Sequence, residues 1–507
     1  MPRTREPDLT PARGSDNPAP GGQIAARMDR LPITRTHRRA TLAVGLGMFF
    51  DIYEVFLAGV LSGVLTAEFH LTKAALAPVL GSTFIGMFLG ALVLGRAADR
   101  FGRRGAFLVN LALYSVFSLV GAFSPNAVFL MISRFLAGIG LGAELPLADT
   151  YLTDLLPARR RGRYVAWAYT VSFIGVPFVG FLAHSLFEHT VLGLSGWRWI
   201  FIIGALGSVV VFFLRRNLPE SPRWLESMGR ADEAERITAR FERDAVAEGH
   251  QLADPSPDDS STDDSSAGAE AGTDPTAGTE TTPGTEPAAG TGRTSATGPV
   301  LASSAGPVRA LFRPPYGRRT AMMLVFHLFQ TIGYYGFGTM VPLVLAAKGF
   351  PVGQSLLFTA VTYLGYPVGS ALSLPIVERF ERKFLIIWAA FGMAVFGLLF
   401  GSAHAMAAIL IFGFLYTATS NVFSNSYHIY QAEIFPTALR STAASGTYAL
   451  SRLATAVMPF VLVPVLDKAG VGALFAVVCA ALAIVGINVA VLGPRTTGRR
   501  LEAVNQR

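Results

Sequence analysis

The chain has little charge and almost no cysteine. Charged residues make up 15% of its 507 residues, whereas 51% are hydrophobic, a balance that excludes an ordinary soluble protein of this length. The single cysteine, Cys479, excludes an intramolecular disulfide and leaves the redox compartment undetermined. The sequence contains no metal, nucleotide or nucleophile constellation, so we expect neither an enzyme nor a bound cofactor or metal. The composition predicts a protein with many membrane-spanning segments.

Apolar runs divide the chain into two similar parts. A helix needs roughly 20 residues to cross a hydrocarbon core of about 30 Å, and six runs of that length lie in residues 37–214 and six more in 320–492. They predict an all-α integral membrane protein with twelve transmembrane helices in two six-helix bundles. The runs are 40–64, 76–95, 105–123, 126–150, 163–186, 197–214, 320–346, 354–377, 384–402, 405–431, 442–466 and 469–492.

Positive charge is distributed unevenly among the loops. Lys and Arg near span ends are retained on the cytoplasmic side of a membrane. With both termini cytoplasmic, nearly all of them fall inside, and the cations of the outer loops are Lys73, Arg198, Lys348 and Lys468. This sidedness explains the net charge of +8, so we expect a lipid bilayer and not a nucleic acid as the partner. Arg far outnumbers Lys, which favours a GC-rich bacterial genome and hence a bacterial inner membrane.

Three segments lie outside the predicted spans. Residues 1–36 are rich in Pro and Arg, and we expect a disordered cytoplasmic tail there. Residues 215–319 form a central cytoplasmic loop, in which the acidic insert 249–308 consists mainly of Ala, Gly, Thr, Ser, Pro and carboxylates. Such a composition cannot bury a core and predicts disorder; a tolerated spacer is favoured over a regulatory segment. Residues 493–507 form a second cytoplasmic tail.

Two charge patterns each recur 279 positions downstream. A shared offset for two separated patterns predicts a duplicated, pseudo-symmetric architecture of the kind found in two-halved membrane transporters. The first pattern is Asp99, Arg100, Phe101, Arg103 and Arg104, repeated as Glu378, Arg379, Phe380, Arg382 and Lys383. The second pattern is Tyr151, Asp154, Pro157 and Arg161, repeated as Tyr430, Glu433, Pro436 and Arg440.

We interpret these repeated charges as a gating latch at the cytoplasmic ends of the spans. Asp154 is the natural acceptor for the first turn, and Glu433 for the second. A network formed only when the cytoplasmic mouth is shut would bias a two-state equilibrium by a few kcal/mol. Plain topogenic charge explains the arginines but not the repeated acids. The latch residues are Asp99, Arg100, Arg103, Arg104, Asp154, Arg161, Glu220, Arg379, Arg382, Glu433 and Arg440.

Several motifs resemble those of one transporter family. They are the turn Gly95 to Arg104, Arg134-Phe135 followed by Gly138, Gly140, Gly142, Glu144 and Pro146, Trp197-Arg198-Trp199, Pro219 to Leu225, and Glu433-Ile434-Phe435-Pro436 through Arg440. With them the chain resembles a major facilitator superfamily transporter of the sugar-porter-like and metabolite:proton symporter branches. The resemblance implies transport of a small molecule by alternating access, and we expect a functional monomer.

Charges inside the predicted spans are candidates for proton coupling. Glu54 and Arg134 lie about 15 Å and about 12 Å from the outer ends of antiparallel spans one and four, hence in one layer. An acid facing an arginine exists as an ion pair or as a protonated acid beside a free cation, and changing between them moves one proton. The family resemblance implies this role for Tyr53-Glu54 and Arg134. Asp51, one turn away, is a candidate second proton site. The alternative is a static ion pair, and for Glu144 we favour a structural or latch role.

A polar stripe in span ten marks a candidate substrate site. Its residues recur with helical spacing on one face, and polar side chains of spans seven and eleven lie at a similar depth. A buried Arg452 suits a carboxylate, although it could also pair with an acid of the protein. Interhelical hydrogen bonding is the alternative for any single residue. The candidate set is Gln330, Tyr334, Tyr335, Asn421, Ser424, Asn425, His428 and Arg452.

The resemblance to true sugar porters ends at this site. His428 stands where that family has a tryptophan, and Phe329–Tyr335 lacks its paired glutamines. Gly333–Phe337 followed by Pro342 is more similar to the branch that carries niacin, aromatic acids and small organic acids. We therefore predict a proton-coupled symporter that takes up a small polar solute, with an organic or aromatic acid favoured over a sugar or polyol. A proton-driven efflux antiporter and a non-transporting nutrient sensor remain the alternatives.

Overall fold

The computed structural model describes residues 23–252, 307–314, 316–435 and 437–496. Helices account for nearly all of the regular structure in these ranges. The exception is one hairpin, in which β1 (Thr190–Val191) pairs antiparallel with β2 (Leu194–Ser195). The acidic part 253–306 of the predicted insert and the outer parts of both predicted tails lie outside the described residues.

The first half of the chain forms one helical bundle. Three of its predicted spans are divided between two helices, with breaks at Leu61, Ala143 and Ile174. Side-chain caps define two of the helix starts, because the Thr72 hydroxyl accepts from the Ala75 N–H at 3.2 Å and Asn126 accepts from the Phe129 N–H at 2.9 Å. The helices are α2 (Arg35–Val60), α3 (Ser62–Glu68), α4 (Lys73–Phe101), α5 (Arg103–Ala122), α6 (Ala127–Gly142), α7 (Glu144–Leu155), α8 (Ala158–Phe173), α9 (Gly175–Leu186) and α10 (Gly196–Arg215).

The second half forms the other bundle. Its last helix contains a break at Gly470, whose φ of 78° and ψ of −176° are not helical. Glycine adopts this backbone conformation readily because it has no Cβ. The helices are α13 (Pro307–Leu311), α14 (Gly317–Ala347), α15 (Val352–Tyr363), α16 (Gly365–Arg379), α17 (Arg382–Ser402), α18 (Met406–Glu433) and α19 (Thr437–Leu492).

The helices are membrane-spanning by length and composition. Within the described ranges, 10 helical stretches meet both criteria. The 31-residue α14 is not among them, and the stretch Gly446–Leu492 is one of the 10 although Gly470 interrupts it. The prediction of an all-helical membrane protein is confirmed, whereas the count of twelve spans and the location of the termini remain predictions.

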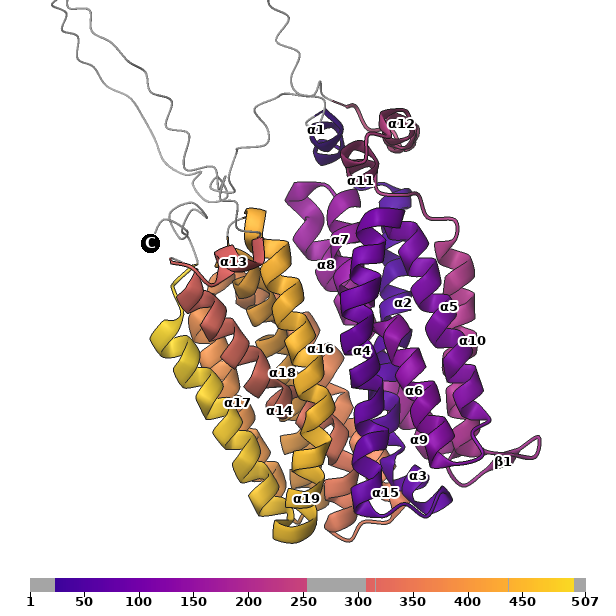
Figure 1. The fold of residues 1–507 in the computed structure, drawn as a ribbon, viewed down its shortest axis with the longest axis vertical. Coiled ribbons are helices and arrows are strands. Elements are labelled where there is room, and N and C mark those ends of the chain that lie inside the picture. The colour runs from indigo at the N-terminus through magenta and orange to yellow at the C-terminus, as the bar shows by residue number, and fades with distance from the viewer. Residues whose placement is uncertain (1–22, 253–306, 315, 436, 497–507) are drawn as a thin grey trace, which may run out of the picture.

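The two bundles stand side by side (Figure 1). At one end lie the hairpin, α3 and α15; we call this the α3 end. There α9 packs against α15, the His184 Nδ1 lies 3.0 Å from the Gly353 carbonyl oxygen, and Lys73 pairs with Asp467 across the two halves. At the opposite end, which we call the α12 end and which the charge distribution predicts to be cytoplasmic, the ribbons of the two bundles diverge.

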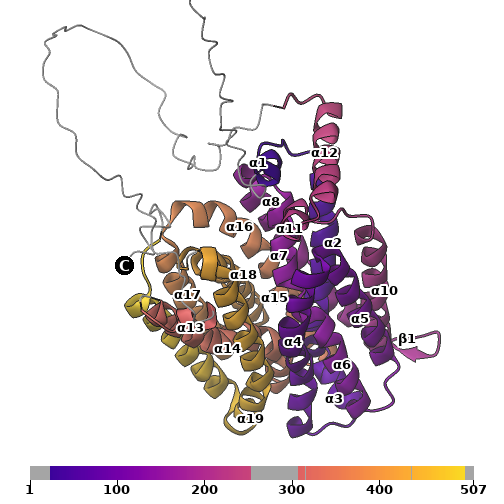
Figure 2. The same cartoon turned by 45° about the horizontal axis from the view of Figure 1, so that its top comes forward.

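Three short helices cover the first bundle at the α12 end (Figures 1 and 2). They are α1 (Gln23–Asp29), α11 (Pro222–Ser227) and α12 (Ala231–Ala247). Ile24 and Met28 of α1 are buried in one apolar cluster with Trp224 and Phe241. The expectation that all of residues 1–36 lack structure is therefore wrong for Gln23 onwards, because α1 has an apolar face that the charged α12 helix covers.

Charged contacts hold α1 against α12. The Arg27 guanidinium donates to both oxygens of Glu242, at 3.0 and 2.7 Å, and Arg30 donates to the same carboxylate at 2.7 Å. The hydrogen bonds from Arg27 hold the pKa of the Glu242 carboxyl below its ordinary value. The segment before the first span is thus tied to the central loop.

Candidate substrate and proton pathway

Glu54 of α2 and Arg134 of α6 form a buried ion pair. Their side chains are 0% and 1% exposed, and the Arg134 Nη2 also donates to the Glu54 carbonyl oxygen at 2.6 Å. The Ser118 hydroxyl donates to the Glu54 carboxylate at 2.5 Å, and the Arg134 Nε donates to the Thr83 hydroxyl at 3.2 Å. The two side chains that share one predicted layer therefore meet, and each has further hydrogen-bond partners. Their role in proton coupling stays a prediction.

Close packing of α4 on α6 brings Thr83 to this pair. A Cβ at Gly138 would lie 2.2 Å from the Thr83 carbonyl oxygen, and a Cβ at Gly90 would lie 2.0 Å from the Ile139 carbonyl oxygen. Only residues without a side chain allow such an approach. The glycines of the span-four motif therefore pack helices, and by doing so they place Arg134 within reach of α4.

A second buried ion pair joins Glu144 of α7 to Arg215 of α10, with side chains 0% and 1% exposed. The Arg215 guanidinium also donates to the carbonyl oxygens of Ala43 and Val44, at 3.3 and 3.0 Å. The Asn110 amide donates to Glu144 at 3.3 Å. Sequence reasoning missed Arg215, because an arginine at the end of an apolar run looks like an ordinary cytoplasmic flank.

Asp51, the predicted second proton site, lies near this second pair. It is 2% exposed, and neither of its carboxylate oxygens has a hydrogen-bond partner among the described residues. Its electrostatic neighbours are Glu144, Arg215, Tyr114 and Glu54. The first half therefore holds a buried acid between two ion pairs.

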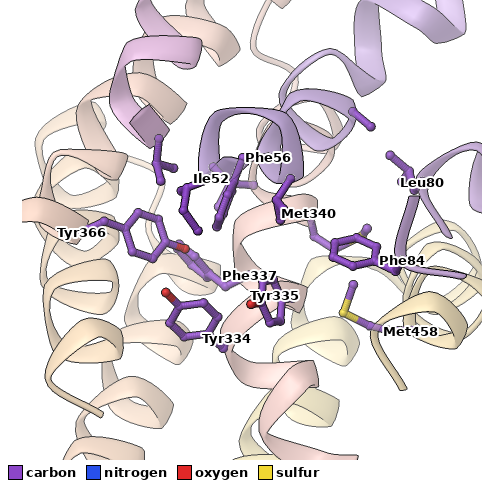
Figure 3. Packing of buried hydrophobic residues seen from close by; sticks show 14 of the residues in the cluster. Ile52, Phe56, Leu80, Phe84, Tyr334, Tyr335, Phe337, Met340, Tyr366 and Met458 are labelled. Atoms are coloured by element: carbon purple, nitrogen blue, oxygen red, sulfur yellow. The ribbon is translucent and has the colours of Figure 1, made fainter. Parts of the chain in front are cut away.

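Tyrosines of the second half face the first half (Figure 3). The Tyr334 hydroxyl donates to the Asn421 side-chain oxygen at 3.0 Å, and the Asn421 amide donates to the Tyr366 carbonyl at 2.5 Å. Tyr335 and Tyr366 both contact the Phe56 ring of α2, with ring centroids 6.5 and 5.5 Å away. The predicted aromatic surface thus lies between the bundles, and hydrogen bonds to Tyr334 and Tyr366 fix the Asn421 side chain next to it.

Arg452 and Gln330 are buried with unsatisfied polar atoms. Arg452 is 2% exposed and donates through Nη2 to the Tyr448 hydroxyl at 2.7 Å, while its Nε and Nη1 have no acceptor. Gln330 is 1% exposed, and within the described ranges neither its side-chain oxygen nor its nitrogen has a hydrogen-bond partner. In the part of the chain that the structure describes, no carboxylate lies within ion-pair distance of Arg452. The guanidinium instead faces the rings of Tyr335 and Tyr448, at 4.9 and 4.4 Å.

The remaining members of the span-ten stripe have different surroundings. Ser424 is buried, and Asn425 donates to the Ser373 hydroxyl of α16 at 2.6 Å, which is an interhelical hydrogen bond. His428 is exposed, and its ring centroid lies 6.4 Å from that of Tyr169 on α8 of the other half. The structure therefore brings Asn421 and Arg452 to the Tyr334–Tyr335 surface and turns His428 toward the first bundle.

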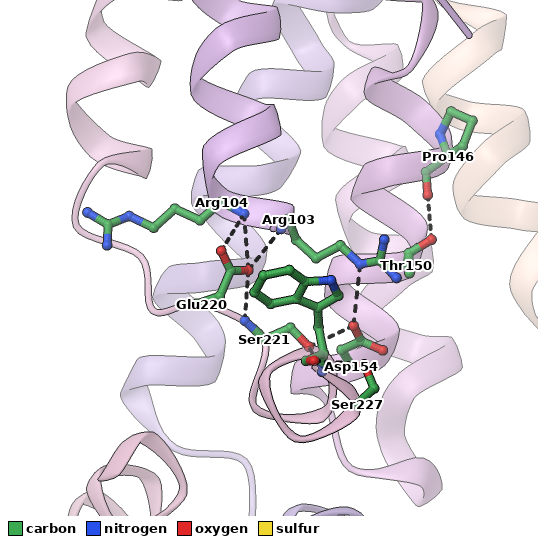
Figure 4. A network of polar contacts seen from close by, with 9 residues as sticks. Arg103, Arg104, Pro146, Thr150, Asp154, Glu220, Ser221 and Ser227 are labelled. Carbon is green, nitrogen blue, oxygen red and sulfur yellow. Dashed lines mark hydrogen bonds and ion pairs between the residues drawn. The ribbon is translucent and has the colours of Figure 1, made fainter. Parts of the chain in front are cut away.

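The first set of predicted latch residues forms a network at the α12 end (Figure 4). The Arg103 Nε lies 3.8 Å from the Asp154 carboxylate, which also accepts from the Ser221 hydroxyl at 2.7 Å. The Glu220 carboxylate accepts the backbone N–H groups of Arg103 and Arg104, at 3.0 and 3.1 Å. Glu220 therefore caps the start of α5, where backbone N–H groups have no partner within the helix.

The second set repeats the pairing. The Arg382 Nε lies 3.3 Å from the Glu433 carboxylate. The Arg161 side chain lies 3.4 Å from Asp29 of α1, and its membership of the latch stays a prediction. The Arg103–Asp154 and Arg382–Glu433 pairs each join helices of one half, and whether they depend on closure of the mouth stays a prediction.

Four predicted latch residues have no described part in these networks. Arg100 and Arg379 are exposed, and the Arg100 guanidinium lies 5.5 Å from the centroid of its neighbouring ring, Phe101. The side chains of Asp99 and Arg440 lie outside the described residues. The repeated pattern therefore includes both paired and solvent-facing cations.

Two bundles of membrane-spanning helices, with buried ion pairs in one and unsatisfied polar groups at the surface between them, define a membrane transporter. Comparisons with known proteins give the family. The chain belongs to the major facilitator superfamily, whose family model matches residues 44–360, and the model for sugar (and other) transporters matches residues 294–507.

Individual relatives are bacterial membrane proteins. The putative metabolite transport protein YyaJ of Bacillus subtilis is 30% identical over 86% of this chain and 87% of its own. The niacin transporter NiaP of Acinetobacter baylyi is 27% identical over 95% of this chain and 99% of its own. Among solved structures, the xylose transporter XylE from E. coli, in a partially occluded inward open conformation, superposes with a TM-score of 0.69 at 19% identity, covering 92% of this chain and 99% of that one.

These findings confirm the predicted class. The protein is a multi-pass transporter of a bacterial inner membrane and not an enzyme. They leave its substrate and the function of the individual site residues open to proposal.

Proposed function

We propose that this protein is a monomeric proton-coupled symporter that takes up a small organic acid by alternating access. The observation that carries the proposal is Arg452, a buried guanidinium with two unsatisfied nitrogens and no described carboxylate partner. A buried arginine without a partner is costly, and a substrate carboxylate would supply the missing acceptors through charge-assisted, bidentate hydrogen bonds. Neither a sugar nor a polyol carries the negative charge that this position lacks.

Two further groups of the second half are suited to a small ligand. Tyr335 supplies an aromatic face beside the Arg452 guanidinium, and the buried Gln330 amide, which the predicted depth of its span places in the same layer, has no hydrogen-bond partner among the described residues. Hydrogen bonds from an otherwise unsatisfied amide and contact with an aromatic ring together orient a compact polar molecule. Ring-containing acids use both features.

Proton coupling is assigned to the Glu54–Arg134 pair. When Glu54 is ionised, the pair joins α2 to α6 inside the first bundle. Protonation of Glu54 removes the attraction and leaves Arg134 with the neutral acceptors Thr83 and the Glu54 carbonyl. The two protonation states therefore favour different packings of the bundle, which allows a proton to bias the conformational equilibrium.

Two relatives support the two parts of this proposal, the acidic substrate and the coupling to protons. One is named for niacin transport, and niacin is a ring-containing acid. Another, the arabinose-proton symporter of Bacillus subtilis, is 24% identical over 82% of this chain and 83% of its own and is named for proton symport. The organic-acid assignment rests on Arg452 and not on these names.

A ligand screen followed by uptake measurement tests the proposal. A ligand at about 100 times its dissociation constant stabilises the folded protein by roughly 2.7 kcal/mol, so thermal shifts separate organic acids from sugars. In proteoliposomes with an imposed pH gradient, a bound acid is expected to accumulate with the unsubstituted protein, whereas Glu54→Gln is expected to retain exchange and lose accumulation.

A matched substitution controls for the loss of a carboxylate. Glu68 lies 3.8 Å from Arg198 near the α3 end, with 34% of its side chain exposed, so Glu68→Gln is expected to accumulate substrate normally. Full accumulation by Glu54→Gln would refute the coupling assignment. Outward proton-driven flux would instead identify an exporter, and ligand binding without flux would identify a sensor.

A further inference from the structure

An acid that the sequence analysis did not single out lies where the two halves meet. Asp149 and Tyr169 of the first half stand 279 positions before His428 and Tyr448 of the second, so the two pairs are equivalent in the repeat. The Tyr169 ring centroid lies 6.4 Å from that of His428. One member of each pair therefore meets the other across the boundary between the halves.

Asp149 presents a carboxylate toward this cluster. It is half-buried on α7, and its Oδ2 accepts a hydrogen bond from the Tyr169 hydroxyl at 2.9 Å. No lysine or arginine of the described ranges lies within ion-pair distance of it. The described chain therefore supplies this carboxyl group with a hydroxyl donor but with no counter-charge.

Tyr448 connects this acid to the arginine of the other half. Its hydroxyl accepts from the Arg452 Nη2 at 2.7 Å, and its electrostatic neighbours include both Arg452 and Asp149. A carboxyl group of one half and a guanidinium of the other are thus both electrostatic neighbours of one tyrosine, and among the described residues no ion pair joins them. Asp149 belongs to the first bundle, and Arg452 belongs to the second.

We infer that the substrate is amphoteric: its carboxylate binds Arg452, and a cationic or N–H-bearing nitrogen of the same molecule binds Asp149. This inference rests on the proposed function. When the pathway closes around a ligand, both side chains lose water, and a charge left without a partner in a buried site is costly. A ligand with both groups compensates both charges, whereas a simple carboxylate leaves Asp149 uncompensated. Because the ligand then bridges the halves, its binding favours their approach.

The alternative function for Asp149 is to orient Tyr169. A positioning acid would act only through its hydrogen bond to that hydroxyl, so Tyr169→Phe would reproduce the effect of Asp149→Asn. A ligand-binding acid retains its charge in Tyr169→Phe and loses it in Asp149→Asn. The two substitutions therefore separate the two functions, and Asp149→Glu restores the charge.

Three ring compounds of similar size test the inference with the purified full-length protein. 3-(Aminomethyl)benzoate carries both charges, benzoate only the negative one and benzylamine only the positive one. We expect the unsubstituted protein to bind 3-(aminomethyl)benzoate at least about tenfold more tightly than either of the others, as for one charge-assisted hydrogen bond. Asp149→Asn is expected to abolish the difference from benzoate, while Tyr169→Phe and Asp149→Glu retain most of it.

Each other result overturns the inference. Equal binding of benzoate and 3-(aminomethyl)benzoate to the unsubstituted protein excludes an amphoteric site but leaves the proposed transport of an organic acid intact. A preference that survives in Asp149→Asn, or is lost equally in Tyr169→Phe, excludes Asp149 as the ligand for nitrogen. If the protein binds none of the three compounds, the inference is contradicted. If it binds benzylamine alone, both the inference and an anion site at Arg452 are contradicted. Melting curves without ligand establish that each variant is folded.

Discussion

Removing the charge of Glu144 should destabilise the first bundle strongly. Glu144→Gln preserves the shape of the side chain but removes the only carboxylate of the described residues that lies within ion-pair distance of the buried Arg215 guanidinium. Breaking a buried pair by removing one partner costs about 3–5 kcal/mol. Arg215 keeps two backbone carbonyl acceptors and lies 4.4 Å from the Phe107 ring centroid, so we expect the lower limit, about 3 kcal/mol.

Thermal unfolding of the purified protein measures this loss. For a unit of the size of the first bundle, about 3 kcal/mol lowers the midpoint by roughly 6–12 °C. Glu233→Gln is the matched control, because Glu233 pairs with Arg230 on the surface of α12 with side chains 39% and 49% exposed. An exposed pair of this kind contributes about 0.2–0.5 kcal/mol, so its midpoint should hardly move.

A double substitution separates the lost charge from other effects. Replacing both partners of a buried pair with groups that need no counter-charge is often neutral, so Glu144→Gln combined with Arg215→Met should recover most of the lost midpoint. Two results would contradict this reasoning. In the first, Glu144→Gln and Glu233→Gln have the same melting midpoint. In the second, the double variant has a lower midpoint than Glu144→Gln alone.

Two further predictions concern the same half of the chain. A Cβ at Gly47 would lie 1.9 Å from the Arg215 Nη2, whereas one at Gly95 would meet nothing within 4 Å. Gly47→Ala should therefore lower the free energy of unfolding by about 1–3 kcal/mol through overpacking, and Gly95→Ala should lower it much less. Equal melting midpoints of the two variants would contradict this prediction. Because docking to Arg27 lowers the pKa of Glu242 from its ordinary 4.5, docking of α1 should be fully stabilised above pH 4.5 and weaken as the pH falls through the lowered value. Hydrogen exchange in α1 should accelerate on acidification, and Arg27→Gln should remove this pH dependence. If the protection of α1 in the unsubstituted protein does not change with pH, the contact does not stabilise its docking.

The helical membrane class could be predicted because lipid offers the backbone no hydrogen-bond partners. A segment without water must satisfy its own N–H and C=O groups, so a long apolar run becomes a helix. The fixed rise per residue then gives depth along the helix, which is why Glu54 and Arg134 could be expected in one layer. The repeat of 279 residues gave the equivalence of the two halves.

Depth alone leaves the rotation of each helix and its neighbours undetermined. Arg215 ends an apolar run, where a long side chain can extend to the interface, and only the packing of α10 against α2 and α7 turns it inward to Glu144. Asp149 stands within the last two turns of α7, and nothing in its local sequence distinguishes a lipid-facing from a pathway-facing position.

The sequence by itself determined the class of the protein, its helical membrane fold and the layer in which Glu54 and Arg134 lie. The tertiary structure decided which intramembrane charges meet: Glu54 with Arg134, Glu144 with Arg215, and neither Asp149 nor Arg452 with an opposite charge of the described chain. The physical reason is that helix formation depends on neighbours along the chain, whereas pairing depends on helix rotation and packing, which the close contacts between distant segments establish.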